Sequence, residues 1–301
     1  GLGIPAEPLF RSRSQGFHWS RLSIVQSYMM FGGVAYYLSL LDSSLSLTQN
    51  IDNLYFDVNG PLRREYRRLF KTLFRLPEPY LEIVELLARH KKGLTRVELL
   101  QKLNKDSGGN LSEQLDNLIE YGMVRKYKVR EKNVVKSKGS IYQLMDMFSL
   151  FHIHFADKSG SDNRYWANHL GTPETNTWLG LAYERVCLLH VGQIKETLHI
   201  DTIASEQYCW RSKESTPAAQ IDLIIDRADD VVNVCEIKYS AKEYSLSEEE
   251  AKKMAYRLET FRRETGTKQS LYSTLITASP LTENASSDEI PVKLTMDALF
   301  L

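Results

Sequence analysis

The sequence predicts a multidomain protein that combines all-α segments with a mixed α/β segment. Apolar residues recur at helical spacing through residues 17–75. Residues 78–148 read as three helices followed by two short strand-like runs. From about residue 174 the pattern becomes α-β-β-β-α-β, which is typical of a mixed sheet with helices packed against it. The 301 residues are enough for two domains and a small third one.

The first segment, 1–77, is predicted to be helical. SRLSIVQSYMMFGGVAYYLSLL has helical periodicity interrupted at Gly32 and Gly33, and GPLRREYRRLFKTLF is a charged amphipathic helix that ends near Pro77. A segment of this size buries too little surface to be stable alone. We therefore expect it to be an appendage of another domain.

The second segment, 78–150, has the element order of a winged helix-turn-helix. Thr95, after Gly93, is the predicted N-cap of the second helix. In such domains the third helix enters the DNA major groove. Here that helix offers a polar and acidic surface, which suits a phosphate-lined groove poorly: Asn110, Ser112, Glu113, Asp116 and Asn117.

The predicted hairpin of this segment is basic. Its cations are Arg125, Lys126, Lys128, Arg130, Lys132, Lys136 and Lys138, against Glu131 alone. A basic hairpin can hold a nucleic-acid backbone without reading its sequence. The alternative is a spacer or protein-contact module whose charges are solvated. Both interpretations stay open at this stage.

Residues 151–173 are interpreted as an aromatic-rich linker, and 174–301 as the mixed α/β domain. His152 and His154 have no third ligand at helical or hairpin spacing, so packing or surface roles are expected for them rather than metal binding.

Composition limits the function classes. Lys and Arg together number 38, as do Asp and Glu, so no overall positive charge indicates a nucleic-acid binder. Three dispersed cysteines without a CxxC motif suit a reducing compartment, and we expect a cytoplasmic location. Neither a membrane span nor a signal peptide is predicted.

The stretch AQIDLIIDRADDVVNVCEIKYS carries the strongest chemical signal. Residues two apart on a strand face the same side, so Glu236 and Lys238 project together. If the two strands pair through the short turn, Asp222 can approach Glu236. Two adjacent carboxylates repel each other unless a cation lies between them, and Mg²⁺ prefers such oxygen ligands. The alternative is a buried ion pair or the charge pattern of an edge strand.

The helix TWLGLAYERVCLLHV adds a third acid. Glu184 lies on the same stripe as Gly180, Cys187 and Leu188, a face that should pack against the sheet. Gly180 is expected to allow close approach of this helix. The alternative for Glu184 is a position at the edge of the stripe that reaches solvent.

This set of residues resembles the PD-(D/E)XK nuclease superfamily, over roughly residues 170–290. The resemblance assigns Asp222 to the first strand acid, Glu236 to the (D/E), Lys238 to the K and Glu184 to the acid of the opening helix. The Pro of the motif is absent, since Gln220 and Ile221 precede Asp222.

Over nearly its whole length, the chain is similar to the C-terminal part of archaeal-type AAA+/STAND-related ATPases. The similarity rests on FGGVAYYLSLL, NIDNLYFDVNGPLRREYRRLF, the winged-helix pattern, WLGLAYERVCLLHV and QIDLIID…VCEIKYS. In that family an ATPase core ends in a helical lid, followed by a winged helix and a nuclease-like domain. The resemblance implies that 1–77 is a lid remnant. No G-x-x-x-x-G-K-[ST] motif is present, so we expect a fragment without its ATPase core.

Together these features predict metal-dependent hydrolysis of phosphodiesters. Asp222, Glu236 and Glu184 are the expected ligands of Mg²⁺ or Mn²⁺, and Lys238 is expected to stabilise the phosphate or orient water. The expected partners are DNA and the ATPase core of the full-length protein; a homo-oligomer is left open, and no membrane is expected. The main alternative is an inactive nuclease fold that binds nucleic acid or protein and regulates the ATPase. A transcription regulator using the winged helix ranks last, because it leaves the Asp-Glu-Lys set unexplained.

Overall fold

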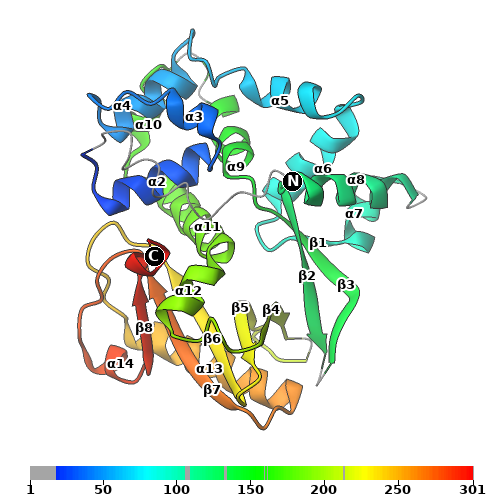
Figure 1. The fold of residues 1–301 in the computed structure, drawn as a ribbon, viewed down its shortest axis with the longest axis vertical. Helices are drawn as coiled ribbons and strands as arrows, with labels where there is room; N and C mark the ends of the chain where they lie inside the picture. The colour runs from blue at the N-terminus through cyan, green and yellow to red at the C-terminus, as the bar shows by residue number, and fades with distance from the viewer. Residues whose placement is uncertain are drawn as a thin grey trace. The chain divides into compact units, whose positions relative to one another are not determined.

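A computed structural model describes residues 18–105, 109–131, 134–158, 160, 162–212 and 214–300. The chain is mixed α/β, as Figure 1 shows with the residues coloured along the sequence. It divides into two compact units. Unit 1 comprises the described parts of Gly1–Lys126 and Ile141–Val186, and unit 2 those of Tyr127–Ser140 and Cys187–Leu301. The chain passes between the units within one β-hairpin and again within one helix.

Unit 1 begins with the helices predicted around the glycine pair. Helix α2 (Arg21–Phe31) starts at Ser20, whose hydroxyl accepts the Ser23 amide, and ends at Gly32. Gly32 has φ +66°, a conformation that glycine adopts without steric cost. Helix α3 (Ala35–Ser39) follows, which confirms the predicted interruption.

Three further elements complete the N-terminal part of unit 1. They are α4 (Leu47–Ile51), the π-helical turn η1 (Asp52–Phe56) and α5 (Glu65–Leu73). Helix α4 starts with a capping box that the side chains of Ser46 and Gln49 form. The sequence NIDNLYFDVNG therefore contains a wide helical turn that periodicity does not reveal.

The segment interpreted as a linker instead forms the aromatic core of unit 1. Helix α9 (Met147–His154) packs on α2, and α10 (Tyr165–His169) packs on η1. The ring of Phe151 lies 5.2 Å from that of Trp166 and 5.3 Å from that of Trp178. The linker interpretation is wrong. The apolar residues on either side of the polar stretch 157–164 belong to helices α9 and α10, and most of them are buried.

Residues 78–144 contain three helices and a hairpin in the predicted order. They form α6 (Glu78–Arg89), α7 (Arg96–Lys102), α8 (Gly109–Glu120), β2 (Val124–Glu131) and β3 (Val134–Leu144). The two-residue strand β1 (Leu94–Thr95) pairs antiparallel with β3. Thr95 is the N-cap of α7, as predicted, and forms a capping box with Glu98. At Gly93 a Cβ would lie 2.5 Å from the Tyr142 carbonyl oxygen, so only glycine fits there.

Unit 2 is built on five neighbouring strands whose order in the sheet is the same as their order in the sequence. Its strands are β4 (Ser205–Arg211), β5 (Gln220–Arg227), β6 (Val231–Lys238), β7 (Ser270–Thr277) and β8 (Val292–Thr295). The pairs β4·β5 and β5·β6 are antiparallel, whereas β6·β7 and β7·β8 are parallel. The parallel pair β6·β7 requires a long crossover, which α13 (Glu248–Thr265) supplies. A short pairing joins the outer part of β2 to β4 at Val129 and Cys209.

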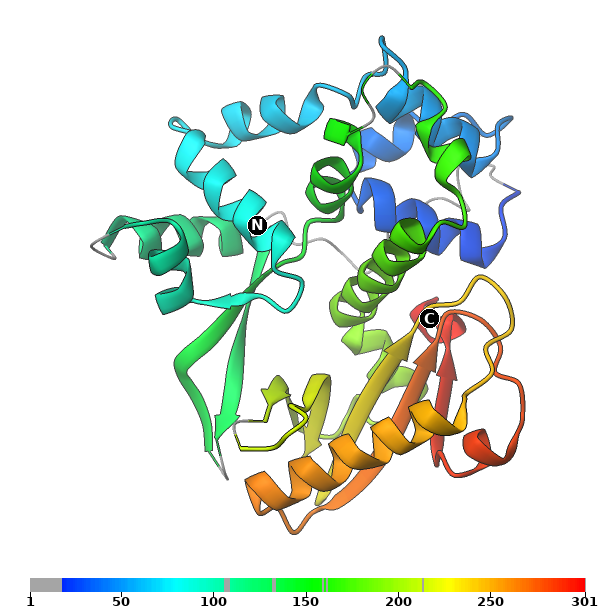
Figure 2. The same cartoon turned by 180° about the vertical axis from the view of Figure 1, so that it is seen from behind.

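Two helices flank this sheet. Helix α12 (Val191–Thr197) and helix α13 lie on opposite faces, as Figures 1 and 2 show from the two sides. On the α13 face, Phe261 packs against Val232 and Val234 of β6 and Ile224 of β5. The even-numbered residues of β6 therefore face α13, and this alternation decides where Glu236 and Lys238 point.

The remaining elements are the long helix α11 (Pro173–Leu189) and three short ones: η2 (Ala156–Lys158), α14 (Ala285–Asp288) and η3 (Met296–Leu299). In the part of the chain that the structure describes, no helix is both long enough and apolar enough to cross a membrane.

Candidate functional site

The β5–β6 hairpin brings the two predicted strand acids to the same end of the sheet. The antiparallel register of the two strands ends with Leu223 opposite Cys235, one residue before Asp222 and Glu236. The pairing of β5 with β4 shifts between Ile224 and Ile221, so regular alternation along β5 is interrupted next to Asp222. Glu236 lies on the face of β6 that α13 covers, and Asp222 lies beyond the last residue of β5 that is paired with β6.

Lys238 completes a polar cluster at this end of β6. Its Nζ lies 3.1 Å from Glu236 Oε1 and 3.4 Å from Glu250 Oε1. Glu250 belongs to the first turn of α13, where its carboxylate closes a capping box with Ser247. Tyr244 donates its hydroxyl to Glu250 Oε1 at 2.9 Å. One ammonium group therefore bridges a strand acid and a helix acid.

Arg257 is the second cation of the cluster. From α13 it donates Nη1 to Glu236 Oε2 at 2.6 Å, so both oxygens of Glu236 contact a positive charge. The side chain of Glu236 is 18% exposed and that of Arg257 is 29% exposed. This cluster is partly open to solvent, so a ligand can reach it without unfolding the sheet.

The titration of the helix acid follows from these contacts. Burial on its own would raise the pKa of Glu250, but hydrogen bonds from Tyr244 and Ser247 and the nearby Lys238 outweigh it and lower the pKa. Burial, together with the hydrogen bond to Glu250 and its charge, raises the pKa of Tyr244. Glu250 is therefore ionised and Tyr244 is protonated at neutral pH.

Asp222 has fewer contacts than Glu236. The amide of Gln220, two residues earlier on the same face, donates to Asp222 Oδ1. Asp226, further along the strand, has both oxygens engaged, by the Tyr208 hydroxyl at 3.0 Å and the Gln269 amide at 2.9 Å. Asp226 thus fixes the sheet, whereas Asp222 offers an oxygen to a ligand.

Glu184 lies in unit 1, where its carboxylate pairs with the neighbouring Arg185. Arg185 is 1% exposed and also donates to the backbone oxygens of Leu144 and Lys91. Glu184 therefore balances a buried guanidinium. The close approach expected at Gly180 is not present, because a Cβ built there meets no described atom within 4 Å.

The donor set of unit 2 fits a hard cation only with two protein carboxylates. Among the described residues, no group of three or more His, Cys, Asp or Glu side chains is arranged to hold a metal ion. Mg²⁺ commonly takes one or two carboxylates and completes its shell with water and substrate phosphate. Asp222 and Glu236 supply the oxygen type that Mg²⁺ prefers, and a cation bound to Glu236 has to displace Lys238 from Oε1 or Arg257 from Oε2.

The two histidines have packing roles, in agreement with their interpretation from the sequence. His152 stacks on Tyr66 with ring centroids 4.8 Å apart, and His154 Nε2 lies 3.2 Å from Glu174 Oε1. Burial, and then the neighbouring Lys158, lower the pKa of His154, although Glu174 acts in the opposite direction.

The basic hairpin is described in part. Lys126 Nζ lies 5.6 Å from the centre of the Tyr142 ring, and Lys128 Nζ lies 4.0 Å from Glu206 Oε1. Arg125 is half-buried at the start of β2. Lys132 lies outside the described residues, and only the backbone is described for Arg130, Lys136 and Lys138.

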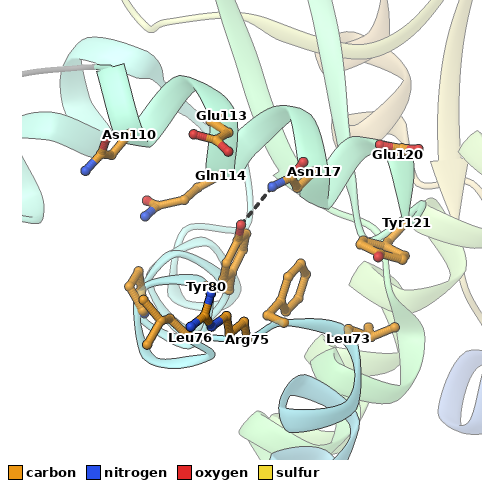
Figure 3. Close-up of a pocket in the computed structure, with 12 residues that line it drawn as sticks. Leu73, Arg75, Leu76, Tyr80, Asn110, Glu113, Gln114, Asn117, Glu120 and Tyr121 are labelled. Carbon is orange, nitrogen blue, oxygen red and sulfur yellow. Dashed lines mark hydrogen bonds between the residues drawn. The ribbon is translucent and has the colours of Figure 1, made fainter.

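Helix α8, the predicted third helix, lines a pocket of about 480 Å³ with α6 and the segment before it (Figure 3). The rings of Phe74 and Tyr80 are stacked 3.7 Å apart, and Asn117 donates to the Tyr80 hydroxyl at 2.8 Å. Glu113 and Glu120 add two carboxylates to the rim. Carboxylates repel phosphate, so this surface disfavours a DNA backbone, as the sequence had indicated.

Sequence reasoning missed Arg257 and the bridging role of Glu250. A signal was present: Glu250, Met254, Arg257 and Phe261 recur at intervals of four, three and four along α13. Met254 and Phe261 are buried, so the two charged residues between them share the face toward the sheet.

Comparison of the chain with models of protein families, with curated proteins and with solved structures gives no match.

Proposed function

We propose that unit 2 contains a metal-dependent nuclease domain of the PD-(D/E)XK type that hydrolyses phosphodiester bonds of DNA. The observation that carries the proposal is the cluster at the end of β6, where Lys238 Nζ lies 3.1 Å from Glu236 Oε1, with Asp222 near the same end of the neighbouring strand β5. Two carboxylates and a lysine at one end of a hairpin support this chemistry over a purely structural ion pair, because Asp222 has few contacts of its own.

In this proposal Asp222 and Glu236 hold Mg²⁺ or Mn²⁺. When bound there, the cation would supply polarisation of the scissile phosphate and a lowered pKa of the attacking water. Lys238, freed from one oxygen of Glu236, orients the water or stabilises charge that develops on the phosphate. Arg257 neutralises Glu236 before a metal binds and is then available to a phosphate oxygen. Glu250 keeps Lys238 in place through the 3.4 Å contact.

The same proposal gives the rest of the chain its context. We infer that 1–77 is a lid remnant and 78–150 a winged helix, so the chain is the C-terminal region of an AAA+/STAND-related ATPase. The order of three helices and a hairpin supports the second part of this inference. Cytoplasmic location and an ATPase core as partner follow from that inference.

The proposal is tested by incubating the chain with plasmid and single-stranded DNA in Mg²⁺ or Mn²⁺, beside the Lys238→Ala variant. We expect cleavage by the wild type and a loss of at least about a hundredfold in the variant, in the range that general acid–base and electrostatic groups contribute. Lys253→Ala, on the exposed side of α13, is the matched control and should retain full activity. Equal cleavage by wild type and Lys238→Ala would refute the proposal.

A second candidate is a nuclease fold that no longer hydrolyses DNA and serves as a binding or regulatory module. It is favoured by the 2.6 Å contact between Arg257 and Glu236, which leaves the cluster electrically satisfied without a metal. Isothermal titration with Mn²⁺ separates the two. A competent site binds the ion in the wild type and loses it in Asp222→Ala, whereas the second candidate predicts no binding in either protein.

A further inference from the structure

Unit 1 contains a cavity of about 580 Å³ between α5, α6, α9 and α11, far in sequence from the carboxylate cluster. Its lining carries more positive than negative side chains: Arg67, Arg89, Lys91 and Lys158 against the acid Glu85, with the neutral His154 beside them. Leu150, Ile153 and Trp178 form an apolar wall. Since the chain as a whole has no net charge, this concentration of positive charge is local.

Among the described side chains, three of these cations lie apart from any carboxylate. Lys158 Nζ lies 2.9 Å from Glu174 Oε1 and is neutralised. For Arg67, Arg89 and Lys91, no carboxylate lies within ion-pair distance among the side chains that the structure describes. Three like charges around one cavity repel each other, and an anion would relieve that repulsion.

Hydrogen bonds and aromatic packing in the core of unit 1 fix the cavity wall. The carbonyl oxygen of Lys91 accepts hydrogen bonds from the buried Arg185 and, at 2.9 Å, from Gln143. Trp178 is 2% exposed and packs on Phe151 and Phe155. The backbone at Lys91 and the apolar wall are thus fixed by the core, so the cavity does not depend on surface side chains alone.

The geometry points to a binding site for a small phosphorylated organic molecule, and we propose this ligand class for the cavity. Guanidinium groups such as those of Arg67 and Arg89 match the oxygens of a phosphate, and Lys91 adds a point charge. The wall of Leu150, Ile153 and Trp178 accepts an apolar body. The volume is within the range of small-molecule pockets. This proposal does not depend on the function assigned to unit 2.

The test uses 1-naphthyl phosphate as the probe, with inorganic phosphate as the head group alone and 1-naphthol as the body alone. Isothermal titration of the whole chain should show binding of 1-naphthyl phosphate at least about tenfold tighter than that of either part. Absence of binding by the wild type, or equal affinity for inorganic phosphate and 1-naphthyl phosphate, would overturn the proposal.

The double variant Arg67→Gln/Arg89→Gln should weaken the binding of 1-naphthyl phosphate by at least about tenfold, while Arg68→Gln should leave this binding unchanged. Arg68 is exposed on the same helix and does not line the cavity, so it controls for a general loss of positive charge. Far-ultraviolet circular dichroism verifies that each variant is folded. An unchanged affinity in the folded double variant contradicts the proposal.

A further arm distinguishes a nucleic acid from a small molecule. A twelve-nucleotide single-stranded DNA should leave the affinity for 1-naphthyl phosphate unchanged. If the oligonucleotide displaces the probe competitively, the cavity is part of a nucleic-acid surface and the proposal is wrong.

Discussion

Glu236 illustrates how one residue can be held by contacts that also limit its function. Each of its carboxylate oxygens contacts a cation, Lys238 Nζ at 3.1 Å and Arg257 Nη1 at 2.6 Å. In a site open to solvent such pairs contribute little to folding stability, typically below about 1 kcal/mol. Their larger effect is on ligand binding, because a divalent cation has to compete with Arg257 for the same oxygen.

The variant Arg257→Gln tests this competition. Removing the guanidinium leaves Glu236 with more negative charge for a metal, so we expect Mn²⁺ to bind roughly three- to tenfold more tightly, as a change of one nearby charge suggests. Isothermal titration measures the change, with Lys253→Gln on the exposed side of α13 as the control. Weaker binding than in the wild type would show that Arg257 supports the metal site instead of opposing it.

At the scale of elements, η1 and α10 are joined through one buried carboxylate. Asp52 of η1 is 6% exposed and accepts the backbone amides of Trp166 at 2.8 Å and Ala167 at 3.3 Å. These amides belong to the first turn of α10, which otherwise lacks a side-chain cap. Burial raises the pKa of Asp52, and the two amide hydrogen bonds reduce that rise.

This pKa shift makes the contribution of Asp52 to stability depend on pH. Because the pKa is higher in the folded than in the unfolded chain, the contribution is fully present below about pH 4. It is lost as the pH rises toward the folded pKa, by about 1.4 kcal/mol for each unit of pKa difference. Asp52→Asn cannot titrate, so the excess stability of the wild type over this variant should shrink with rising pH.

Urea unfolding at a series of pH values measures this difference. Asn53→Ser, on the exposed neighbouring position, should give a curve parallel to that of the wild type. A stability difference between wild type and Asp52→Asn that stays constant between pH 4 and 7 would contradict the assigned shift.

For the whole molecule, the sequence predicted elements and local charge better than long-range placement. The helix break at Gly32 and the cap at Thr95 depend on neighbours in sequence, and the structure contains both. The predicted approach of Asp222 to Glu236 depends on strand register, and the paired residues end one position before these two. Arg257 and the core role of α9 depend on packing between distant segments. Periodicity carries no information about which helix covers which face.

The charge distribution of the molecule leads to a prediction about DNA. If the hairpin holds the backbone, the triple variant Arg125→Gln/Lys126→Gln/Lys128→Gln should lower the affinity. It should also reduce the slope of log K against log salt by about two to three, since each lost phosphate contact removes about 0.9 from the slope for duplex DNA. Fluorescence anisotropy with labelled duplexes at several salt concentrations measures both quantities.

The control variant removes negative charge, whereas the triple variant removes positive charge. Glu113→Gln/Glu120→Gln removes two acids from the α8 pocket and should not lower the affinity. A triple variant with an unchanged salt slope would exclude the hairpin as the DNA-binding element.

The discontinuous make-up of unit 1 has a consequence for synthesis of the chain. Its first part ends at Lys126, but the aromatic helix α9 and the buried Arg185, which anchors Lys91, come only after residue 140. During translation the N-terminal helices therefore emerge long before the segment that completes their core. In that interval the apolar faces of α2 and η1 are exposed, and a chaperone or the ribosome surface has to cover them. Unit 1 can therefore complete its core only after residues 141–186 have been synthesised.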